Sequence, residues 1–258
     1  MASVRLSRRQ SLKGLATAGT LPWAASAAPR NPLPPVRLVI LDVGGTIIQD
    51  RGDIPAELQR ALGKRGIKAT PEEIARWRGA AKREIVRHFV EQQPAAPGVD
   101  REKLIASIYE EFTARLIEIY RSVPPIQGAE AAIHQLRQSG YLVATTTGFD
   151  RAITDSIFRR LGWERNFAAV ICSDDVKEGR PFPYMLFHAM EAAKVTSVAE
   201  VVAVGDTPLD LQAGSNAGLR AVVGVLTGAA TEEKLRQEPH THILPSVAQL
   251  PGLLASKI

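Results

Sequence analysis

The sequence predicts an α/β protein with a Rossmann-like parallel sheet, helices on both faces of that sheet, and a small α-helical cap inserted after the first strand. From residue 128 onward, short apolar runs alternate with helical patterns, which is typical of a parallel sheet covered on both faces. Another apolar run stands alone at residues 36–41. Between them, residues 51–125 carry helical patterns and no strand-like run, and a chain of 258 residues has room for such an insertion.

Three helices are expected in the cap, at residues 55–64, 70–89 and 100–121. The first has a proline in its first turn, where the missing N–H is tolerated. The second starts at Thr70, an N-cap residue followed by a proline and two acids. Apolar side chains then recur at helical spacing, which predicts one continuous helix with a single apolar face. These side chains are Ile74, Trp77, Ala81, Ile85 and Phe89.

The alternating pattern downstream predicts the rest of the sheet and its helices. The expected strands are residues 141–147, 168–173, 201–205, 221–226 and 241–244. The expected helices are residues 129–139, 151–161, 183–193, 208–217, 231–237 and 247–254. The core is therefore expected to comprise residues 36–50 and 126–258, with the cap at 51–125.

The first 27 residues resemble a twin-arginine signal peptide. Arg8 and Arg9 supply the arginine pair, and a mildly apolar stretch follows at residues 14–24. Residues 25–27, Ala-Ser-Ala, have the small-x-small form of a cleavage site. The order of these three regions predicts export to the periplasm or the medium.

Residues 28–35 form a Pro-rich linker that leads into the first strand. The apolar stretch in the leader is too short for a stable membrane span, so no such span is expected. A misassigned start codon is the alternative to export, and it would leave a basic leader on a cytoplasmic protein.

Charge and cysteine content narrow the possible partners. The net charge is +5, but residues 1–27 carry four basic residues and no acid, so the remainder carries only +1. A nearly neutral domain has no electrostatic footprint for nucleic acid, and no nucleic-acid partner is expected. The single cysteine, Cys172, excludes an internal disulfide, and we expect it to be packed in the core.

Two carboxylates follow buried apolar runs. Asp42 comes at the end of the first run, beside a glycine turn, and Asp206 follows the run at 201–204. Ligands of open α/β sheets bind at the carboxyl ends of the strands. Two carboxylates at this edge predict a site for a hard cation with oxygen ligands, such as Mg²⁺.

With these positions assigned, the chain resembles the haloacid dehalogenase superfamily of phosphoryl-transfer enzymes over residues 36 to 255. The resemblance rests on four motifs in order, each at a strand end or a helix start. They are Asp42-Val43-Gly44-Gly45-Thr46, Thr147-Gly148, Arg180-Pro181-Phe182-Pro183 and Gly205-Asp206-Thr207-Pro208-Leu209-Asp210.

The resemblance implies a phosphoryl-transfer site. Asp42 is the expected nucleophile, because a carboxylate can accept a phosphoryl group covalently. Arg180 supplies a permanent cation against the transferring group. The other residues expected to bind that group are Gly45, Thr46, Thr147 and Gly148. The expected substrate is a small phosphorylated or phosphonate compound.

A magnesium ion is the implied cofactor. Asp42, Asp206 and the backbone carbonyl of Gly44 are the expected ligands. Asp210 is expected to support either the metal or the arginine; the alternative is a residue that merely caps the helix that follows.

Residue 44 departs from the superfamily pattern. Most members carry a second Asp two residues after the nucleophile, which protonates the alkoxide leaving group; here the residue is Gly44. Positioned acid–base catalysis is worth ~10²–10⁴-fold, so ordinary phosphate-ester cleavage is in doubt. The phosphonatase branch lacks this Asp and cleaves a C–P bond through a Schiff base to a cap lysine.

Lys82 is the candidate for that lysine. The segment Gly79-Ala80-Ala81-Lys82 resembles the Gly-x-x-Lys segment of phosphonatases. On the expected helix, Lys82 lies at the edge of the apolar face with Arg78 one turn earlier, and this predicts a lowered pKa. The alternative is an ordinary surface lysine whose ammonium extends into water.

Three functions remain open from the sequence. The leading one is a Mg²⁺-dependent phosphonatase-like hydrolase, although Phe149 stands where phosphonatases have Tyr. The second is a small-molecule phosphate-ester phosphatase of the phosphoglycolate phosphatase kind. The third is an exported protein that binds phosphate compounds without turnover. A homodimer is also open.

Overall fold

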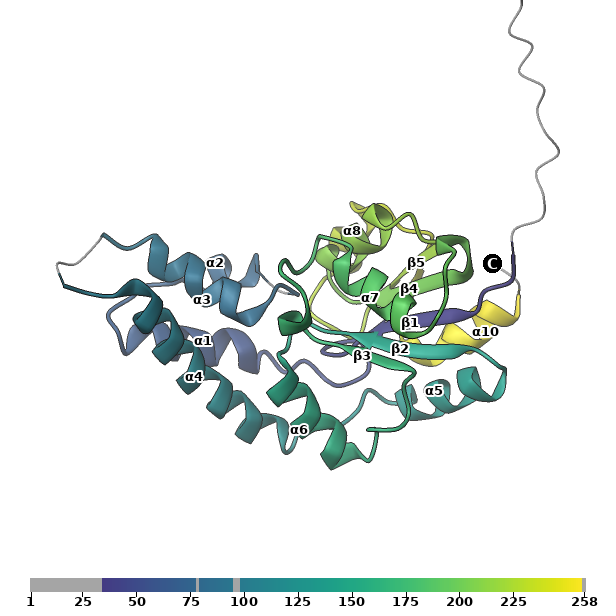
Figure 1. Ribbon diagram of the computed structural model, residues 1–258, viewed down its shortest axis with the longest axis horizontal. Helices are drawn as coiled ribbons and strands as arrows, with labels where there is room; N and C mark the ends of the chain where they lie inside the picture. Colours follow the sequence, from purple (N-terminus) through teal and green to yellow (C-terminus); the bar gives the residue numbers. More distant parts are fainter. Residues whose placement is uncertain (1–33, 78, 95–97, 257–258) are drawn as a thin grey trace, which may run out of the picture. The chain divides into compact units, whose positions relative to one another are not determined.

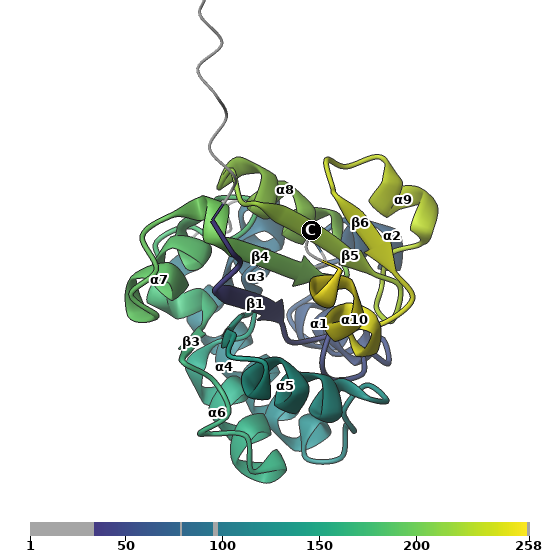
Figure 2. The same cartoon turned by 90° about the vertical axis from the view of Figure 1, so that its right-hand side faces the viewer.

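A single parallel sheet organises the chain (Figures 1 and 2). The computed structural model describes residues 34–77, 79–94 and 98–256. Within these ranges the sheet has six strands in the order β3-β2-β1-β4-β5-β6, and every pairing is parallel. This confirms the predicted Rossmann-like α/β class. The strands are β1 Leu38–Asp42, β2 Leu142–Thr146, β3 Ala169–Ile171, β4 Val201–Gly205, β5 Ala221–Val225 and β6 His242–Leu244.

Alternate side chains of β1 enter two separate cores. Leu38 and Ile40 pack with helices α7 (Tyr184–Ala192) and α8 (Pro208–Asn216) on one face. Val39 and Leu41 pack on the other face with α5 (Ala129–Gln138), α6 (Arg151–Leu161) and α10 (Leu250–Ala255). This period of two is why a continuous apolar run predicted a strand covered on both sides. Helix α9 (Glu232–Arg236) packs against β6 and α8.

The segment between β1 and β2, the insertion, is helical. It contains α1 (Asp53–Gly63), α2 (Pro71–Ala75), α3 (Lys82–Glu91) and α4 (Arg101–Tyr120). The second core extends without a break from the sheet into this insertion, where it includes Phe112 and Leu116. Residues 34–258 accordingly form one compact unit.

The predicted continuous helix at 70–89 is wrong. Thr70 does cap a helix and forms a capping box with Glu73, but α2 ends at Ala75 and α3 begins only at Lys82. Between them Gly79 adopts a φ of 87° and approaches the core so closely that a Cβ would lie 2.6 Å from Thr207 Oγ1. A tertiary contact therefore interrupts a helical pattern that sequence spacing favoured.

Smaller differences concern the ends of elements. The first strand runs to Asp42 itself, so this carboxylate is the last residue of β1. Edge strands β3 and β6 are shorter than predicted. The predicted last helix is divided into a 3-10 turn, Val247–Gln249, and α10.

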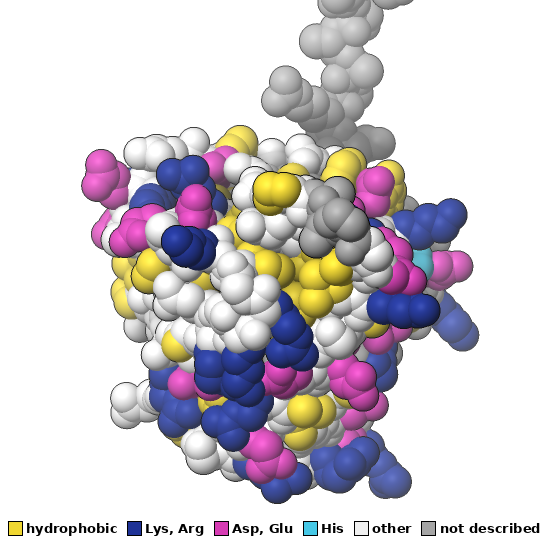
Figure 3. Space-filling model, turned by 90° about the vertical axis from the view of Figure 1, so that its left-hand side faces the viewer, with side chains coloured by type: hydrophobic (Ala, Val, Ile, Leu, Met, Phe, Trp, Pro, Cys, Tyr) yellow, Lys and Arg dark blue, Asp and Glu magenta, His cyan; other side chains and the backbone are white. Residues whose placement is uncertain are grey.

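Helices α1 and α4 are joined by ion pairs on their exposed surfaces. Glu111 of α4 contacts Arg60, Lys64 and Arg65, with N–O distances of 3.1, 2.5 and 3.2 Å. Basic and acidic side chains are interspersed on the face shown in Figure 3. Such exposed pairs contribute roughly 0–1 kcal/mol each, so buried packing holds the insertion together.

No helix in the described part of the chain is both long enough and apolar enough to cross a bilayer. The predicted signal peptide, residues 1–27, lies outside the described residues.

Candidate active site

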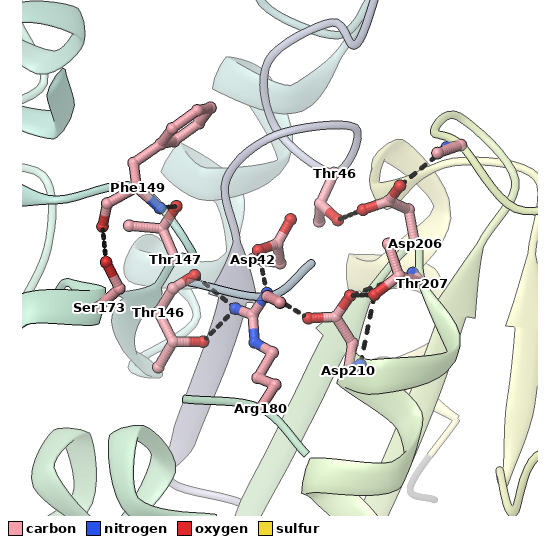
Figure 4. A network of polar contacts seen from close by, with 12 residues as sticks. Asp42, Thr46, Thr146, Thr147, Phe149, Ser173, Arg180, Asp206, Thr207 and Asp210 are labelled. Atoms are coloured by element: carbon pink, nitrogen blue, oxygen red, sulfur yellow. Dashed lines mark hydrogen bonds and ion pairs between the residues drawn. The ribbon is translucent and has the colours of Figure 1, made fainter. Parts of the chain in front are cut away.

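Three neighbouring strands end at one point of the sheet edge. Asp42 ends β1, Asp206 follows β4 and Thr147 follows β2. Because β1 pairs with both β2 and β4 in a parallel sheet, these carboxyl ends lie side by side. Oxygen atoms of Asp42, Asp206 and Asp210 lie within 4.8 Å of one another, and all three residues are buried. The two carboxylates predicted to converge do so (Figure 4).

Arg180 connects these groups from the loop that precedes α7. Its Nη1 atom lies 2.8 Å from Asp42 Oδ1 and 2.8 Å from Asp210 Oδ1. Its Nη2 atom donates to the carbonyl and to the hydroxyl of Thr146, at 2.9 and 3.0 Å. Burial alone would lower the pKa of Arg180, but the Asp210 and Asp42 carboxylates raise that pKa above its ordinary value. The guanidinium is thus held as a buried cation.

Asp210 has two structural partners. One carboxylate oxygen contacts Arg180, and the other accepts hydrogen bonds from the N–H and the hydroxyl of Thr207, at 3.0 and 2.5 Å. Thr207 caps α8, and Asp210 completes the capping box. The helix-cap role and the arginine-support role, which the sequence left as alternatives, are therefore both filled by this residue.

Neighbouring polar groups hold the Asp206 carboxylate in place. Its Oδ2 accepts from the N–H of Ala229 at 2.9 Å, and its Oδ1 lies 3.4 Å from Thr46 Oγ1. Gly45 passes so close that a Cβ there would lie 2.5 Å from Asp206 Oδ2, and its φ is 85°. Glycine is thus required at position 45 by both space and backbone conformation.

Burial raises the pKa values of two carboxyl groups at the site, those of Asp42 and Asp206. The pKa of Asp42 is raised to about 6, chiefly by burial. Arg180 opposes this rise, and repulsion from Asp210 adds to it. Burial also raises the pKa of Asp206 well above its ordinary value, and repulsion from Asp42 and Asp210 adds to this. Three buried carboxylates around one guanidinium leave an excess of negative charge. Carboxylate oxygens in this arrangement suit a hard divalent cation.

Lys82 is buried and not at the surface. It is 5% exposed, and its Nζ donates to the carbonyl of Ala80 at 3.0 Å. The pKa of Lys82 is lowered from 10.5 to about 8, chiefly by burial; Asp42 opposes this lowering and the Arg180 cation adds to it. Arg78, the cation expected from the helical pattern, lies outside the described residues.

A cavity of about 50 Å³ lies at this site and is lined by residues of both the core and the insertion. A volume of this order accommodates a small group, since a cavity of roughly 10–15 Å³ already holds one water molecule. Seven predicted site residues line it: Asp42, Gly44, Lys82, Thr147, Gly148, Arg180 and Asp206. Gly45, Thr46 and Asp210 lie behind this lining, where they position Asp206 and Arg180.

Several side chains at the site were not predicted from the sequence. Thr146 holds Arg180, and Asp50, Trp77, Tyr120 and Phe149 line the cavity. Thr146 stands next to the recognised Thr147-Gly148 pair, which is the signal that could have identified it. Trp77 was assigned to an apolar helix face because its periodicity suits core packing as well as a cavity wall.

Comparisons of the sequence with known proteins agree on one superfamily. The family model described as haloacid dehalogenase-like hydrolase matches residues 39–224. A phosphonoacetaldehyde hydrolase from Bacillus cereus (strain G9842) is 32% identical over 216 residues, covering 78% of this chain and 81% of the relative. One from Bacillus cytotoxicus is 31% identical over 207 residues, covering 76% and 77%.

Solved structures show the same fold. A phosphonoacetaldehyde hydrolase-like protein from Oleispira antarctica superposes with a TM-score of 0.74 at 21% identity, covering 87% of this chain and 93% of that one. A predicted phosphoglycolate phosphatase from Haemophilus somnus 129pt superposes with a TM-score of 0.71 at 17% identity, covering 84% and 97%. At these identities the likeness concerns the fold and not the substrate.

Proposed function

The chain belongs to the haloacid dehalogenase-like hydrolases, and we propose that it is a Mg²⁺-dependent phosphonatase-like enzyme that cleaves the C–P bond of phosphonoacetaldehyde or a related small phosphonate. One observation carries the proposal. The buried amine of Lys82 lines the same cavity as Asp42, at a site where Gly44 offers no side-chain acid. An amine in this place provides a route for the leaving group that needs no such acid.

The reaction begins at Lys82. Its neutral amine adds to the aldehyde carbon of the substrate, one proton is taken up from water, a water molecule is lost, and a protonated imine forms. The lowered pKa of Lys82, about 8, keeps a useful fraction of the amine neutral near pH 7. The imine then acts as the electron acceptor for the next step.

Asp42 attacks phosphorus through a carboxylate oxygen. The C–P bond breaks and its electron pair moves into the iminium, which leaves a neutral enamine on Lys82 and the phosphoryl group on Asp42. Protonation of the enamine carbon from water and hydrolysis of the imine release acetaldehyde. Water then hydrolyses the aspartyl phosphate, releases inorganic phosphate and restores Asp42. The net reaction consumes one water molecule.

The remaining residues bind and orient the phosphonate. Arg180, already 2.8 Å from Asp42, opposes the charge of the transferring group. The hydroxyl of Thr147 and the N–H of Gly148, both on the cavity wall, are proposed donors to its oxygens. Gly45 and Thr46 act through Asp206, which they hold in place.

The donor set fits the implied metal ion. Asp42, Asp206 and the Gly44 carbonyl would hold Mg²⁺, with Asp210 retained by Arg180. When bound, the ion would neutralise charge on the phosphonate and on the paired carboxylates.

The test is reductive trapping. Borohydride added with phosphonoacetaldehyde should leave an ethyl group on Lys82, formed from the enamine after cleavage, and peptide mass spectrometry should locate it. Lys82→Arg should lose C–P cleavage almost completely, because a guanidinium stays protonated. Lys103→Arg is the matched control, since Lys103 lies in the insertion and is 87% exposed.

Three outcomes would reject this mechanism. If Lys82 carries no adduct and Lys82→Arg keeps full activity, the imine route is wrong. Release of phosphate from phosphate esters, without release from phosphonoacetaldehyde, would indicate an ester phosphatase. Binding of substrate without any release would indicate a non-catalytic binding protein.

We also propose that the enzyme is exported by the twin-arginine pathway. The support is the order of arginine pair, apolar stretch and small-residue cleavage site in residues 1–27. A phosphonatase-like enzyme would then act on phosphonates outside the cytoplasm.

A further inference from the structure

We propose that the ring of Phe149 is the specificity-determining group that closes this site to phosphate esters, an inference that rests on the proposed function. The ring would do so by blocking the space that an acid at position 44 would need and by giving the leaving group an apolar wall. The favoured substrates would be phosphonates whose organic part is a small, uncharged carbonyl group.

Gly44 faces the Phe149 ring directly. A Cβ built on Gly44 would lie 3.4 Å from Phe149 Cε2 and 3.5 Å from Cζ. A Cβ there would make an ordinary van der Waals contact with the ring, so a side chain that extends further in that direction would have to displace the ring. The glycine and the phenylalanine thus act as a complementary pair across the site.

The ring has little freedom to move. Phe149 is 2% exposed, and its ring packs edge-on against that of Tyr120 with centroids 5.0 Å apart. Its N–H donates to Thr147 Oγ1 at 3.1 Å. Its carbonyl accepts from the N–H and the hydroxyl of Ser173, at 2.9 and 3.1 Å (Figure 4). These hydrogen bonds fix the backbone of Phe149, and displacement of its ring would disturb the aromatic packing.

The same ring contacts the proposed imine-forming amine. Lys82 Nζ lies 5.3 Å from the centroid of Phe149. A phenyl ring offers a developing alkoxide neither a proton nor a hydrogen bond, whereas its π face stabilises a cationic iminium. One side chain therefore favours the imine route and disfavours the ester route.

Ester cleavage places a different demand on the site. Asp42 would attack phosphorus, the P–O bond would break, and its electron pair would pass to the ester oxygen. That oxygen must take a proton from a nearby acid as it leaves. A nitrophenolate leaving group is stable without the proton, so p-nitrophenyl phosphate measures nucleophilic attack alone.

The test compares glycolaldehyde phosphate, which is phosphonoacetaldehyde with an added ester oxygen, with p-nitrophenyl phosphate. The rate on the first substrate is divided by the rate on the second for each variant. The variants are Gly44→Asp, Phe149→Ala, Gly44→Asp with Phe149→Ala, and Gly44→Asp with Phe149→Tyr, which keeps a ring in place. If the variant with Gly44→Asp and Phe149→Ala does not fold, because loss of a buried Phe side chain leaves a destabilising cavity, the variant with Gly44→Asp and Phe149→Leu replaces it.

We expect the ratio to rise roughly 100-fold or more only when the acid is introduced and the ring is removed together. An equal rise in Gly44→Asp alone, or in its Phe149→Tyr combination, would show that the ring is no barrier and would overturn the inference. Absence of any rise in folded ring-less pairs would overturn it too. C–P cleavage by the unmodified enzyme is measured separately. Failure of the proposed function can therefore be distinguished from failure of the inference on Phe149.

Discussion

The guanidinium of Arg180 lies 2.8 Å from the carboxylate of Asp42, so a buried cation contacts the proposed nucleophile directly. The same nitrogen lies 2.8 Å from Asp210, and the second nitrogen is held by Thr146. A planar, fixed guanidinium can make these contacts at once. The arginine therefore holds these two carboxylates together, and in the proposed reaction it also opposes the charge of the phosphoryl group.

Arg180→Lys should lower turnover by about 10²–10³-fold, the range seen when one preorganised charge-stabilising donor is lost. An ammonium keeps the charge but cannot contact Asp42, Asp210 and Thr146 together. Steady-state rates on phosphonoacetaldehyde provide the measurement. Arg159→Lys, at a position that is 74% exposed, is the control and should be silent. Turnover within a few-fold of the parent would argue against the assigned role.

Asp42→Asn should reduce turnover by ~10⁴-fold or more while the protein stays folded, because an amide cannot attack phosphorus. The fold should survive because the change removes a buried charge whose pKa is already raised, and Arg180 keeps Asp210 as a partner. Circular dichroism and phosphate release test the two expectations. A folded variant with near-normal turnover would remove Asp42 as the nucleophile.

Asp206→Asn should weaken Mg²⁺ binding by on the order of 10- to 100-fold without removing the nucleophile. The measurement is the rise in melting temperature with Mg²⁺ concentration, which requires no turnover. Asp155→Asn is the matched control, since Asp155 is a 51% exposed carboxylate on α6. If Asp206→Asn and the parent show the same Mg²⁺ midpoint, Asp206 is not a metal ligand.

Trapping of Lys82 by an aldehyde should depend on pH around the lowered pKa. Because the amine must lose a proton to react, the trapping rate should rise about tenfold per pH unit below pH 8 and level off above it. An ordinary lysine would continue to gain reactivity up to about 10.5. Reductive trapping with acetaldehyde, followed by peptide mass spectrometry, isolates this step from C–P cleavage. A midpoint near 10 would mean that burial does not activate the amine.

Residues 1–30 fused to a reporter should direct its export in a bacterium with the twin-arginine pathway. Replacing both Arg8 and Arg9 with lysine should block that export, because the arginine pair is the recognised feature. Reporter activity in periplasmic and cytoplasmic fractions provides the measurement. Retention of the unmodified fusion in the cytoplasm would favour the misassigned start codon.

Prediction from the sequence succeeded where the signal is local. The sequence correctly predicted the carboxylates at the ends of β1 and β4, the cap at Thr70 and the long helix α4, because all of these arise from runs of neighbouring residues. Parallel pairing of strands then brings the two carboxylates together, because strands that alternate with helices end at one edge. The motifs at these strand ends correctly predicted the superfamily and its hydrolytic chemistry.

Prediction failed where a distant contact overrides the local pattern. The helix expected at 70–89 is interrupted because Gly79 packs against Thr207, more than a hundred residues downstream. The interruption places Lys82 at the first turn of a new helix, where the helix end carries a partial positive charge and the side chain is buried. No spacing rule within the insertion contains that information.

The sequence by itself determined the α/β class, the superfamily and the identity of the acids at the strand ends, because these depend on short patterns and on the fixed geometry of parallel sheets. Only the tertiary structure decided which distant residues meet at the site. Lys82 of the insertion lines the same cavity as Asp42, Asp210 forms an ion pair with Arg180, and the ring of Phe149 faces Gly44. The physical reason is that burial and its pKa effects are set by residues far apart in the chain.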